Sequence, residues 1–271
     1  MNIACIAPLF VPADRPDRYS KASKSGADAI IIDLEDAVAS SAKAAARIAL
    51  ATVNALPTNV PVIVRLNGRN TPWYSHDLSC IASLPVAGVM LPKTEKAEDI
   101  SALREALGPR AIFAMIESAR GLAAARDIAS ATQNLRLVFG SFDFSESVGC
   151  EHTRDALLAA RSEIVLASAL GGLLGPIDGV TTALDDDLMV ETDARHAAEL
   201  GFAGKLCIHP RQIRGVLQGF APTVAEIAWA RRVMSEDKEG AFVVDGTMVD
   251  APVKARARRV LRLSNNESRD P

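Results

Sequence analysis

The sequence predicts an α/β protein that folds as a (β/α)8 TIM-type barrel with a small C-terminal helical and hairpin lid. Three observations predict it. Eight short apolar runs recur along the chain, these runs are continuously apolar rather than alternating, and the segments between them have helical spacing. Continuous apolar character is typical of strands that are buried on both faces, as in a parallel sheet. Eight such units within about 210 residues indicate a sheet that closes into a barrel.

The eight apolar runs are the elements that we expect to form the barrel strands. Two of the segments between them, 40–56 and 95–108, are rich in Ala, Lys, Arg and Glu, as expected of surface helices. A doubly wound open sheet is the alternative architecture. The barrel is favoured because the runs number eight and no G-x-G-x-x-G pattern follows the first. In order, the runs are 3–11, 28–34, 61–67, 87–93, 111–118, 135–143, 173–181 and 204–210.

The chain beyond the last run predicts a smaller appendage. Residues 223–240 predict a helix, and residues 241–250 contain two short β-like runs around an Asp-Gly pair, which is a hairpin signal. A basic helix is predicted over 251–263. We therefore expect a barrel over 1–220, a lid or an arm onto a neighbouring subunit over 221–263, and a flexible tail over 264–271.

Composition excludes several classes of function. The net charge is -3 and only 4% of the residues are aromatic, so a nucleic-acid surface is not expected. No apolar stretch reaches the roughly 18 to 20 residues that a membrane-spanning helix needs. The four cysteines are far apart and form no C-x-x-C pair, which is typical of a reduced, cytoplasmic protein.

Charged residues follow most of the apolar runs at the point where each strand is expected to end. The carboxyl ends of barrel strands meet at one rim, and this rim is where barrels of this kind place their functional residues. The sequence therefore predicts a charged cluster at the rim. Its expected members are Asp33, Glu35, Asp36, Arg65, Asn67, Lys93, Glu117, Asp143, Asp178, Lys205 and His209.

Glu117 and Asp143 are the candidate metal ligands. They are expected at the ends of neighbouring strands, which lie about 4.8 Å apart, so their carboxylates can converge. Two converging carboxylates repel each other unless a cation lies between them. Two oxygen ligands that leave room for water and substrate suit Mg²⁺. The alternative is a pair of solvated or salt-bridged loop acids.

Arg65 ends an apolar strand and therefore needs an anionic partner. One interpretation is a structural ion pair with Glu35 or another acid of the rim. The other is a catalytic role, in which the guanidinium stabilises negative charge that develops during a reaction. Glu35 and Asp36 are candidates for orienting water bound to the metal. Their DLED segment is equally typical of the acidic start of a helix.

Seven stretches carry a resemblance that covers nearly the whole chain. This order of motifs resembles the citrate lyase beta-subunit-like family, which includes malyl-CoA and citramalyl-CoA lyases and lies among the class II aldolase-type barrels. In order, the stretches are LFVPADRPDRYSKASKSGADAIIIDLEDAV, VRLNG, LPKTE, IESARGL, FGSFDF, GFAGKLCIHPRQI and GAFVVDGTMVDAPVKARARRVL.

The resemblance implies a Mg²⁺-dependent carbon–carbon lyase. Such an enzyme cleaves or forms a 3-hydroxyacyl-CoA thioester, for example malyl-CoA or citramalyl-CoA, and the products of cleavage are a 2-oxo acid and acetyl-CoA. By motif match, Glu117 and Asp143 are the metal ligands and Arg65 is the catalytic arginine. The resemblance further implies a homo-oligomer, a trimer or hexamer, with shared active sites.

The motif match also gives roles to residues outside the strand ends. Arg15 and Lys21 resemble basic residues along the path of the CoA phosphates, and Asp250 resembles an acid that a neighbouring subunit contributes. The sequence departs from the family pattern at Ala13, where Gly is common, and at Thr247, where Lys is frequent. Three further functions stay open at this point: an aldolase acting on a free 2-oxo acid without CoA, a citrate lyase beta-like subunit acting on an acyl-carrier-protein thioester, and a non-enzymatic subunit.

Overall fold

The computed structural model describes residue 3 and residues 5–53, 56–236 and 240–267. The chain divides into two compact units, Met1–Phe220 and Ala221–Pro271, and each is described by itself. No helix among the described residues is both long and apolar enough to cross a membrane.

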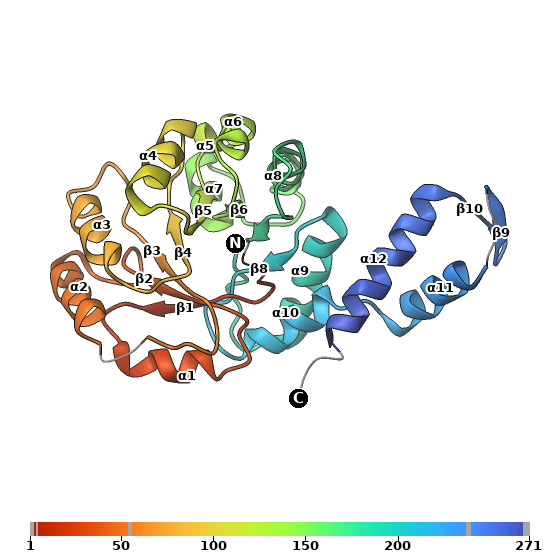
Figure 1. Ribbon diagram of the computed structural model, residues 1–271, viewed down its shortest axis with the longest axis horizontal. Helices are drawn as coiled ribbons and strands as arrows, with labels where there is room; N and C mark the ends of the chain where they lie inside the picture. The colour runs from red at the N-terminus through yellow and green to blue at the C-terminus, as the bar shows by residue number, and fades with distance from the viewer. Residues whose placement is uncertain (1–2, 4, 54–55, 237–239, 268–271) are drawn as a thin grey trace. The chain divides into compact units, whose positions relative to one another are not determined.

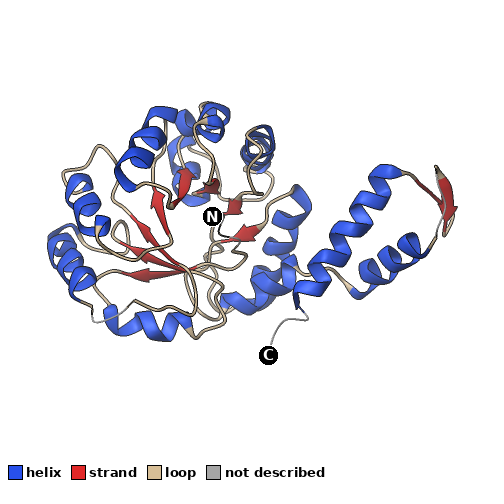
Figure 2. Ribbon diagram, in the orientation of Figure 1, coloured by secondary structure: helices blue, strands red, loops and turns tan. Residues whose placement is uncertain are grey.

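The first unit is a closed barrel of parallel strands with helices around it (Figures 1 and 2). Neighbouring strands in the sequence are also neighbours in the sheet. A parallel bridge between Leu9 and Cys207 joins the last strand to the first. The amide of Phe10 donates to the Cys207 carbonyl (2.9 Å) and the amide of Cys207 donates to the Pro8 carbonyl (2.9 Å). The predicted (β/α)8 barrel is confirmed. Its strands are β1 (Leu9–Pro12), β2 (Ile30–Asp33), β3 (Val62–Arg65), β4 (Gly88–Leu91), β5 (Ala111–Ile116), β6 (Leu135–Phe139), β7 (Ile177–Asp178) and β8 (Gly204–Lys205).

The helices of this unit cover the outer face of the barrel (Figure 2). Their buried apolar side chains pack against every second residue of the strands. The helices are η1 (Pro16–Arg18), α1 (Tyr19–Ser23), η2 (Ser40–Ala42), α2 (Lys43–Thr52), α3 (Tyr74–Ala82), α4 (Ala97–Leu107), α5 (Ala119–Ala123), α6 (Ala125–Ser130), α7 (Ser141–Val148), α8 (Leu158–Leu170), α9 (Asp187–Leu200) and α10 (Gln212–Phe220).

The alternation of residues along each strand decides which side chains reach the barrel interior. In β2, Ile30 and Ile32 belong to the outer core beneath the helices, whereas Ile31 belongs to a separate cluster inside the barrel. Both faces are apolar, which explains why the runs do not alternate. Because successive side chains point to opposite faces, Asp33 follows Ile31 into the interior. Arg65 and Glu117 follow the interior residues of β3 and β5 in the same way.

The amino-terminal end of the barrel is held by one buried arginine. Arg136 of β6 donates hydrogen bonds to the carbonyls of Ile3 (3.3 Å), Cys5 (3.1 Å), Gly175 (2.9 Å) and Ala203 (3.1 Å). These carbonyls belong to the segments that lead into β1, β7 and β8. One side chain therefore ties together the first and last strands of the barrel, at the end opposite to the predicted rim.

Several predicted elements differ from the observed ones at their ends. The run 135–143 was expected to be one strand, but β6 ends at Phe139 and the chain turns at Gly140 into α7. Asp143 therefore lies in the first turn of a helix and not at the end of a strand. The helix predicted over 40–56 is observed as η2 and α2, which ends at Thr52, and residues 54–55 lie outside the described part of the chain.

The described residues of the second unit form two helices and a hairpin. Helix α11 (Val224–Ser235) begins with a capping box formed by Thr223 and Glu226. Strands β9 (Phe242–Val244) and β10 (Thr247–Val249) pair antiparallel and precede α12 (Ala251–Glu267). A small core holds these elements together; its buried residues are Ala230, Val233, Val249, Ala257 and Val260.

The predicted boundaries of this unit need two corrections. Helix α11 ends at Ser235, earlier than the predicted 240, and residues 237–239 lie outside the described residues. Helix α12 continues to Glu267, so the beginning of the predicted tail over 264–271 is helical. Residues 268–271 also lie outside the described residues. Whether the unit acts as a lid or as an arm remains a prediction.

Candidate functional site

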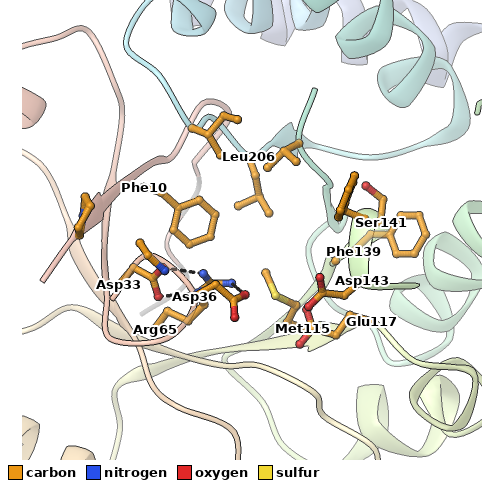
Figure 3. A pocket seen from close by; sticks show the side chains of 16 residues that line it. Phe10, Asp33, Asp36, Arg65, Met115, Glu117, Phe139, Ser141, Asp143 and Leu206 are labelled. Atoms are coloured by element: carbon orange, nitrogen blue, oxygen red, sulfur yellow. Dashed lines mark hydrogen bonds and ion pairs between the residues drawn. The ribbon is translucent and has the colours of Figure 1, made fainter. Parts of the chain in front are cut away.

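A cavity of about 380 Å³ opens at the carboxyl ends of the barrel strands (Figure 3). Its wall combines apolar side chains from the barrel interior with charged residues from the strand ends, the composition expected of a small-molecule site. The residues that line it are Phe10, Pro12, Asp33, Asp36, Ala37, Arg65, Met115, Glu117, Phe139, Gly140, Ser141, Phe142, Asp143, Val180, Leu206 and Ile208.

The arginine of the cavity is fixed by the strand next to it. Asp33 and Arg65 lie opposite each other in the parallel register of β2 and β3. Arg65 donates from Nε to Asp33 Oδ1 (2.7 Å) and from Nη2 to Asp33 Oδ2 (2.6 Å). The guanidinium also lies 4.7 Å from the centre of the Phe10 ring. Burial opposes the charge of Arg65, but the contact with Asp33 outweighs it and the pKa is raised, so the arginine stays charged.

Asp33 is itself held by the backbone that follows it. Its Oδ1 accepts a hydrogen bond from the amide of Glu35 (2.8 Å) and its Oδ2 accepts one from the amide of Ala37 (3.0 Å). A carboxylate that accepts four hydrogen bonds keeps one orientation, and this orientation fixes the position of the Arg65 guanidinium. The sequence predicted Glu35 or another rim acid as the structural partner of Arg65. The main partner is Asp33, another of the predicted rim acids.

The third nitrogen of Arg65 is not used by Asp33. Its Nη1 lies 3.3 Å from Glu35 Oε2 and 3.5 Å from Asp36 Oδ2, two longer ion pairs. Glu35 is buried, and its Oε2 has no hydrogen-bond partner among the described residues. Burial, together with the nearby Asp36, raises the pKa of Glu35 to about 7 against the opposing effects of Arg65 and Lys93.

Glu117 lines the cavity and is almost fully buried. Its Oε1 accepts a hydrogen bond from the Lys93 amide (2.6 Å). Burial, the negative charge of Glu35 and that of Asp143 raise its pKa to about 8. A side chain at position 140 would collide with this carboxylate, because a Cβ atom on Gly140 would lie 2.4 Å from Glu117 Oε2. Glycine at this position therefore makes the space that Glu117 occupies.

Asp143 faces the same cavity from the first turn of α7. Figure 3 shows its carboxylate beside that of Glu117, and the electrostatic effect of Asp143 on Glu117 agrees with this proximity. Lys93 Nζ lies 3.9 Å from Asp143 Oδ2. The structure thus brings together the two acids that the sequence singled out as metal ligands, although Asp143 comes from a helix.

The donor set of the cavity fits a hard divalent cation. Burial and the negative charges of Glu35 and Asp143 raise the pKa of Glu117 despite Arg65 and Lys93, and a bound cation would remove that penalty. Within the described ranges, no three His, Cys, Asp or Glu side chains converge as a metal cage. Mg²⁺ binds through one or two carboxylates and keeps several waters, so a pair of acids suffices for it.

A serine–histidine pair at the cavity edge was not predicted from the sequence. Ser141 begins α7, lines the cavity and lies 2.9 Å from His152 Nε2. Burial and the charges of Arg161 and Lys205 lower the pKa of His152. A lone histidine in a loop gave no sequence signal, because the contact depends on how the chain after α7 returns to the barrel.

Asp178, Lys205 and His209 were predicted at the rim but do not line the cavity. Asp178 and Lys205 form a buried cluster with Arg161 of α8. Arg161 Nε lies 2.9 Å from Asp178 Oδ1, and Lys205 Nζ lies 3.1 Å from Asp178 Oδ2. Ile177 occupies the interior position of β7, so Asp178 points out toward the helices. His209 accepts a hydrogen bond from the Arg211 amide (3.2 Å) and does not line the cavity.

The remaining predicted site residues lie outside the lining of this cavity. Arg15 is exposed and pairs with Asp17 (2.8 Å), and Lys21 is exposed on α1. Asp250 belongs to the second unit, where its carboxylate accepts a hydrogen bond from the Val253 amide (3.1 Å) at the start of α12. Their roles in binding and catalysis remain predictions.

The fold and the cavity define a class: a (β/α)8-barrel protein that places a fixed arginine and two carboxylates at the carboxyl ends of its strands. Comparison with known proteins gives the family. The model of the HpcH/HpaI aldolase/citrate lyase family matches residues 7–210, and the chain belongs to this family.

Several relatives are similar over nearly the whole chain. A citrate lyase subunit beta-like protein from Mycobacterium tuberculosis is 38% identical over 97% of this chain and 97% of its own. A (3S)-malyl-CoA thioesterase from Cereibacter sphaeroides is 33% identical over 93% of this chain and 92% of its own. The crystal structure of protein CitE from M. tuberculosis, in complex with magnesium, acetoacetate and coenzyme A, matches with a TM-score of 0.88 and 36% identity. This match covers 98% of this chain and 100% of that one.

Proposed function

We propose that this protein is a Mg²⁺-dependent carbon–carbon lyase acting on a 3-hydroxyacyl-CoA thioester such as malyl-CoA or citramalyl-CoA. Cleavage would yield a 2-oxo acid and acetyl-CoA, and condensation is the reverse reaction. The observation that carries the proposal is the convergence of Arg65, fixed by Asp33, with Glu117 and Asp143 in one cavity. A related structure that contains both magnesium and coenzyme A supports it.

The two carboxylates are the proposed metal ligands. Glu117 and Asp143 would hold Mg²⁺, and Glu35 and Asp36 would orient the water around it. Bound there, Mg²⁺ would supply Lewis-acid polarisation of the substrate carboxylate and hydroxyl.

Arg65 has the role of stabilising negative charge on a substrate oxygen while the carbon–carbon bond breaks. Two of its nitrogens are held by Asp33, and the Nη1 end lies near Glu35 and Asp36 at the cavity wall. A charged donor that is already oriented needs no reorganisation during the reaction, which is the condition for effective electrostatic stabilisation.

Asp250 is the proposed acid and base. It would protonate the carbon of the departing thioester enolate in the cleavage direction and remove a proton in the condensing direction. We propose that it acts on the active site of a neighbouring subunit, which requires a homo-oligomer such as a trimer or hexamer. Arg15 and Lys21 are the proposed contacts to the CoA phosphates, and a cytoplasmic location is expected.

A second candidate function is hydrolysis of the same thioester. It is favoured by the relative from C. sphaeroides that is described as a (3S)-malyl-CoA thioesterase. The two reactions differ in their products, because hydrolysis releases free CoA thiol and a hydroxy acid, whereas the lyase releases acetyl-CoA and a 2-oxo acid. Two further candidate reactions use a different substrate: aldol cleavage of a free 2-oxo acid without CoA, and lyase cleavage of an acyl-carrier-protein thioester.

The purified chain can be tested against a small panel of acyl-CoA thioesters and free 2-oxo acids, each with Mg²⁺ or with a chelator. A 2-oxo acid assay and a free-thiol assay on the same samples separate the lyase from the hydrolase. We expect 2-oxo acid and acetyl-CoA from the wild-type protein with Mg²⁺, and loss of that activity in Asp143→Asn. Full activity in Asp143→Asn would exclude the metal role assigned to Asp143, and cleavage of only CoA-free substrates would favour the aldolase.

A further inference from the structure

Lys93 has an unusual backbone conformation at the edge of the site. Its φ is 50°, in the left-handed region that residues other than glycine rarely adopt. The turn is held by Thr94, whose amide donates to the Met115 carbonyl (3.1 Å) and whose hydroxyl donates to the Leu91 carbonyl (2.9 Å). Strained residues of this kind persist where the surrounding structure imposes them, and they concentrate at functional sites.

This conformation lets one residue contact three acids of the site. The Lys93 amide donates to Glu117 Oε1 at 2.6 Å. Its ammonium donates to Glu35 Oε1 at 3.0 Å and lies 3.9 Å from Asp143 Oδ2. The backbone of Lys93 therefore orients one proposed metal ligand, while its side chain partly neutralises the other.

We propose that Lys93 is a positioning residue that sets the metal affinity of the cavity: its amide fixes Glu117, and its ammonium is a built-in counter-charge that opposes cation binding at Asp143. The inference rests on the proposed function, because it takes Glu117 and Asp143 as the residues that hold Mg²⁺. The charge of Lys93 opposes binding of the ion, whereas the backbone amide of Lys93 orients Glu117, one of the proposed ligands.

The direction of the effect follows from the charges. A divalent cation held by Glu117 and Asp143 would lie close to an ammonium only 3.9 Å from one of the ligand oxygens. The ammonium would repel the cation or move away from Asp143 when it binds. The Lys93 side chain is about half exposed (52%), so solvent screens this repulsion without removing it. Removing the charge should therefore strengthen Mg²⁺ binding by about tenfold.

Without the metal, the same charge should stabilise the protein. Glu35 is a buried carboxylate, and its positively charged neighbours are Arg65 and Lys93. Removing the ammonium leaves less positive charge near the carboxylates of Glu35, Glu117 and Asp143. The metal-free protein should then melt at a lower temperature, and saturating Mg²⁺ should restore most of the difference.

The test is a calorimetric titration of Mg²⁺ into the metal-free protein, with thermal melting of each variant in chelator and in excess Mg²⁺. Lys93→Met keeps an unbranched side chain of similar length and the backbone amide but removes the charge, and Lys93→Arg keeps the charge. Lys96→Met is the matched control, since Lys96 is an exposed lysine three residues away that makes no capping hydrogen bond with its side chain. We expect the Kd for Mg²⁺ to fall about tenfold in Lys93→Met and to stay within about twofold in the other two variants.

The outcomes separate this inference from the proposed function. An unchanged or higher Kd in Lys93→Met, while the wild-type protein binds Mg²⁺, would overturn the inference alone. A loss of thermal stability in Lys93→Met that Mg²⁺ does not reduce would also overturn it, because a purely structural lysine behaves in that way. Absence of Mg²⁺ binding by the wild-type protein would overturn the proposed function and this inference together.

Discussion

Asp33 and Arg65 lie opposite each other on adjacent parallel strands and form two hydrogen bonds of 2.7 Å and 2.6 Å. Because Asp33 also accepts two backbone amides, the orientation of the arginine is set by the β2 strand and the turn after it. The position of the cationic group in the cavity therefore depends on a carboxylate that needs no contact with substrate.

Replacing Asp33 by Asn should leave Arg65 charged but without its main counter-ion, because only the longer ion pairs with Glu35 and Asp36 remain. Breaking a buried ion pair from one side costs about 3–5 kcal/mol. We expect a loss of stability of that order in denaturant unfolding, and at least a hundredfold fall in kcat/KM. Asp36→Asn is the control, because Asp36 is exposed and lies farther from Arg65 (3.5 Å), so its effect on stability should be below about 1 kcal/mol. Equal stabilities for both variants would contradict the anchoring role of Asp33.

Replacing Gly140 by Ala should disturb the site through sterics alone. The new methyl group would lie 2.4 Å from Glu117 Oε2, so the carboxylate must move away from the position fixed by Lys93. We expect Mg²⁺ binding measured by calorimetry to weaken by at least tenfold. Gly68→Ala is a matched control in a strand-end loop, since its Cβ would meet only side-chain atoms at 3.7 Å and 3.9 Å. Normal Mg²⁺ affinity in Gly140→Ala would show that Glu117 does not need its observed position.

The raised pKa of Glu117 predicts a pH dependence of the metal-free protein. The pKa rises from 4.5 to about 8, so between these values the folded protein holds a proton that the unfolded chain releases. The contribution of Glu117 to the free energy of unfolding is then fully present below about pH 4.5 and is lost as the pH rises toward 8. Glu35, with a pKa of about 7, acts in the same direction.

Denaturant unfolding in chelator at several pH values between 5 and 8 measures this slope. Glu117→Gln should make this slope less steep, because the glutamine side chain does not titrate and only the contribution of Glu35 remains. For the same reason, Mg²⁺ should bind the wild-type protein more tightly as the pH rises toward 8, with release of protons. If the free energy of unfolding of the wild-type protein is constant over this range, the pKa of Glu117 is not raised by burial.

Asp250→Asn should preserve substrate binding and lose turnover if Asp250 is the proton donor. Mixing this variant with Arg65→Ala tests whether the acid acts between subunits, because some mixed oligomers would contain one intact site. We expect partial recovery of kcat in the mixture, to a few tens of per cent of the level that random mixing allows. Variants that remain inactive when mixed, although they exchange subunits, would place Asp250 in the site of its own chain or outside catalysis.

The barrel itself could be predicted because burial on both faces leaves a visible mark on the sequence. Residues such as Ile30, Ile31 and Ile32 must all be apolar when alternate side chains pack on helices and on the interior. The predicted ends of the elements were less accurate. The strand predicted to continue to Asp143 ends at Phe139, and α7 begins after Gly140.

The sequence predicted only those site residues whose positions follow from the ends of the strands. Glu117 and Arg65 occupy interior positions that follow directly from the strand pattern. Asp33 was not singled out among the rim acids as the partner of Arg65, because the register between two strands is set by the sheet and cannot be read from the sequence of one strand. The contacts of Lys93 with the acids of the site could not be predicted, because its left-handed backbone depends on a hydrogen bond of Thr94 to the neighbouring strand β5.

The closure of the barrel also affects how the protein is made in the cell. The bridge between Leu9 and Cys207, and the hydrogen bonds of Arg136 to the carbonyls of Ile3 and Cys5, join the beginning of the chain to segments synthesised much later. During translation, the edge of β1 stays without its partner until β8 has left the ribosome, so the nascent chain exposes an open strand edge for most of its synthesis. Chaperone dependence and aggregation during expression should therefore be more sensitive to substitutions at this seam than to equally buried ones between β3 and β5.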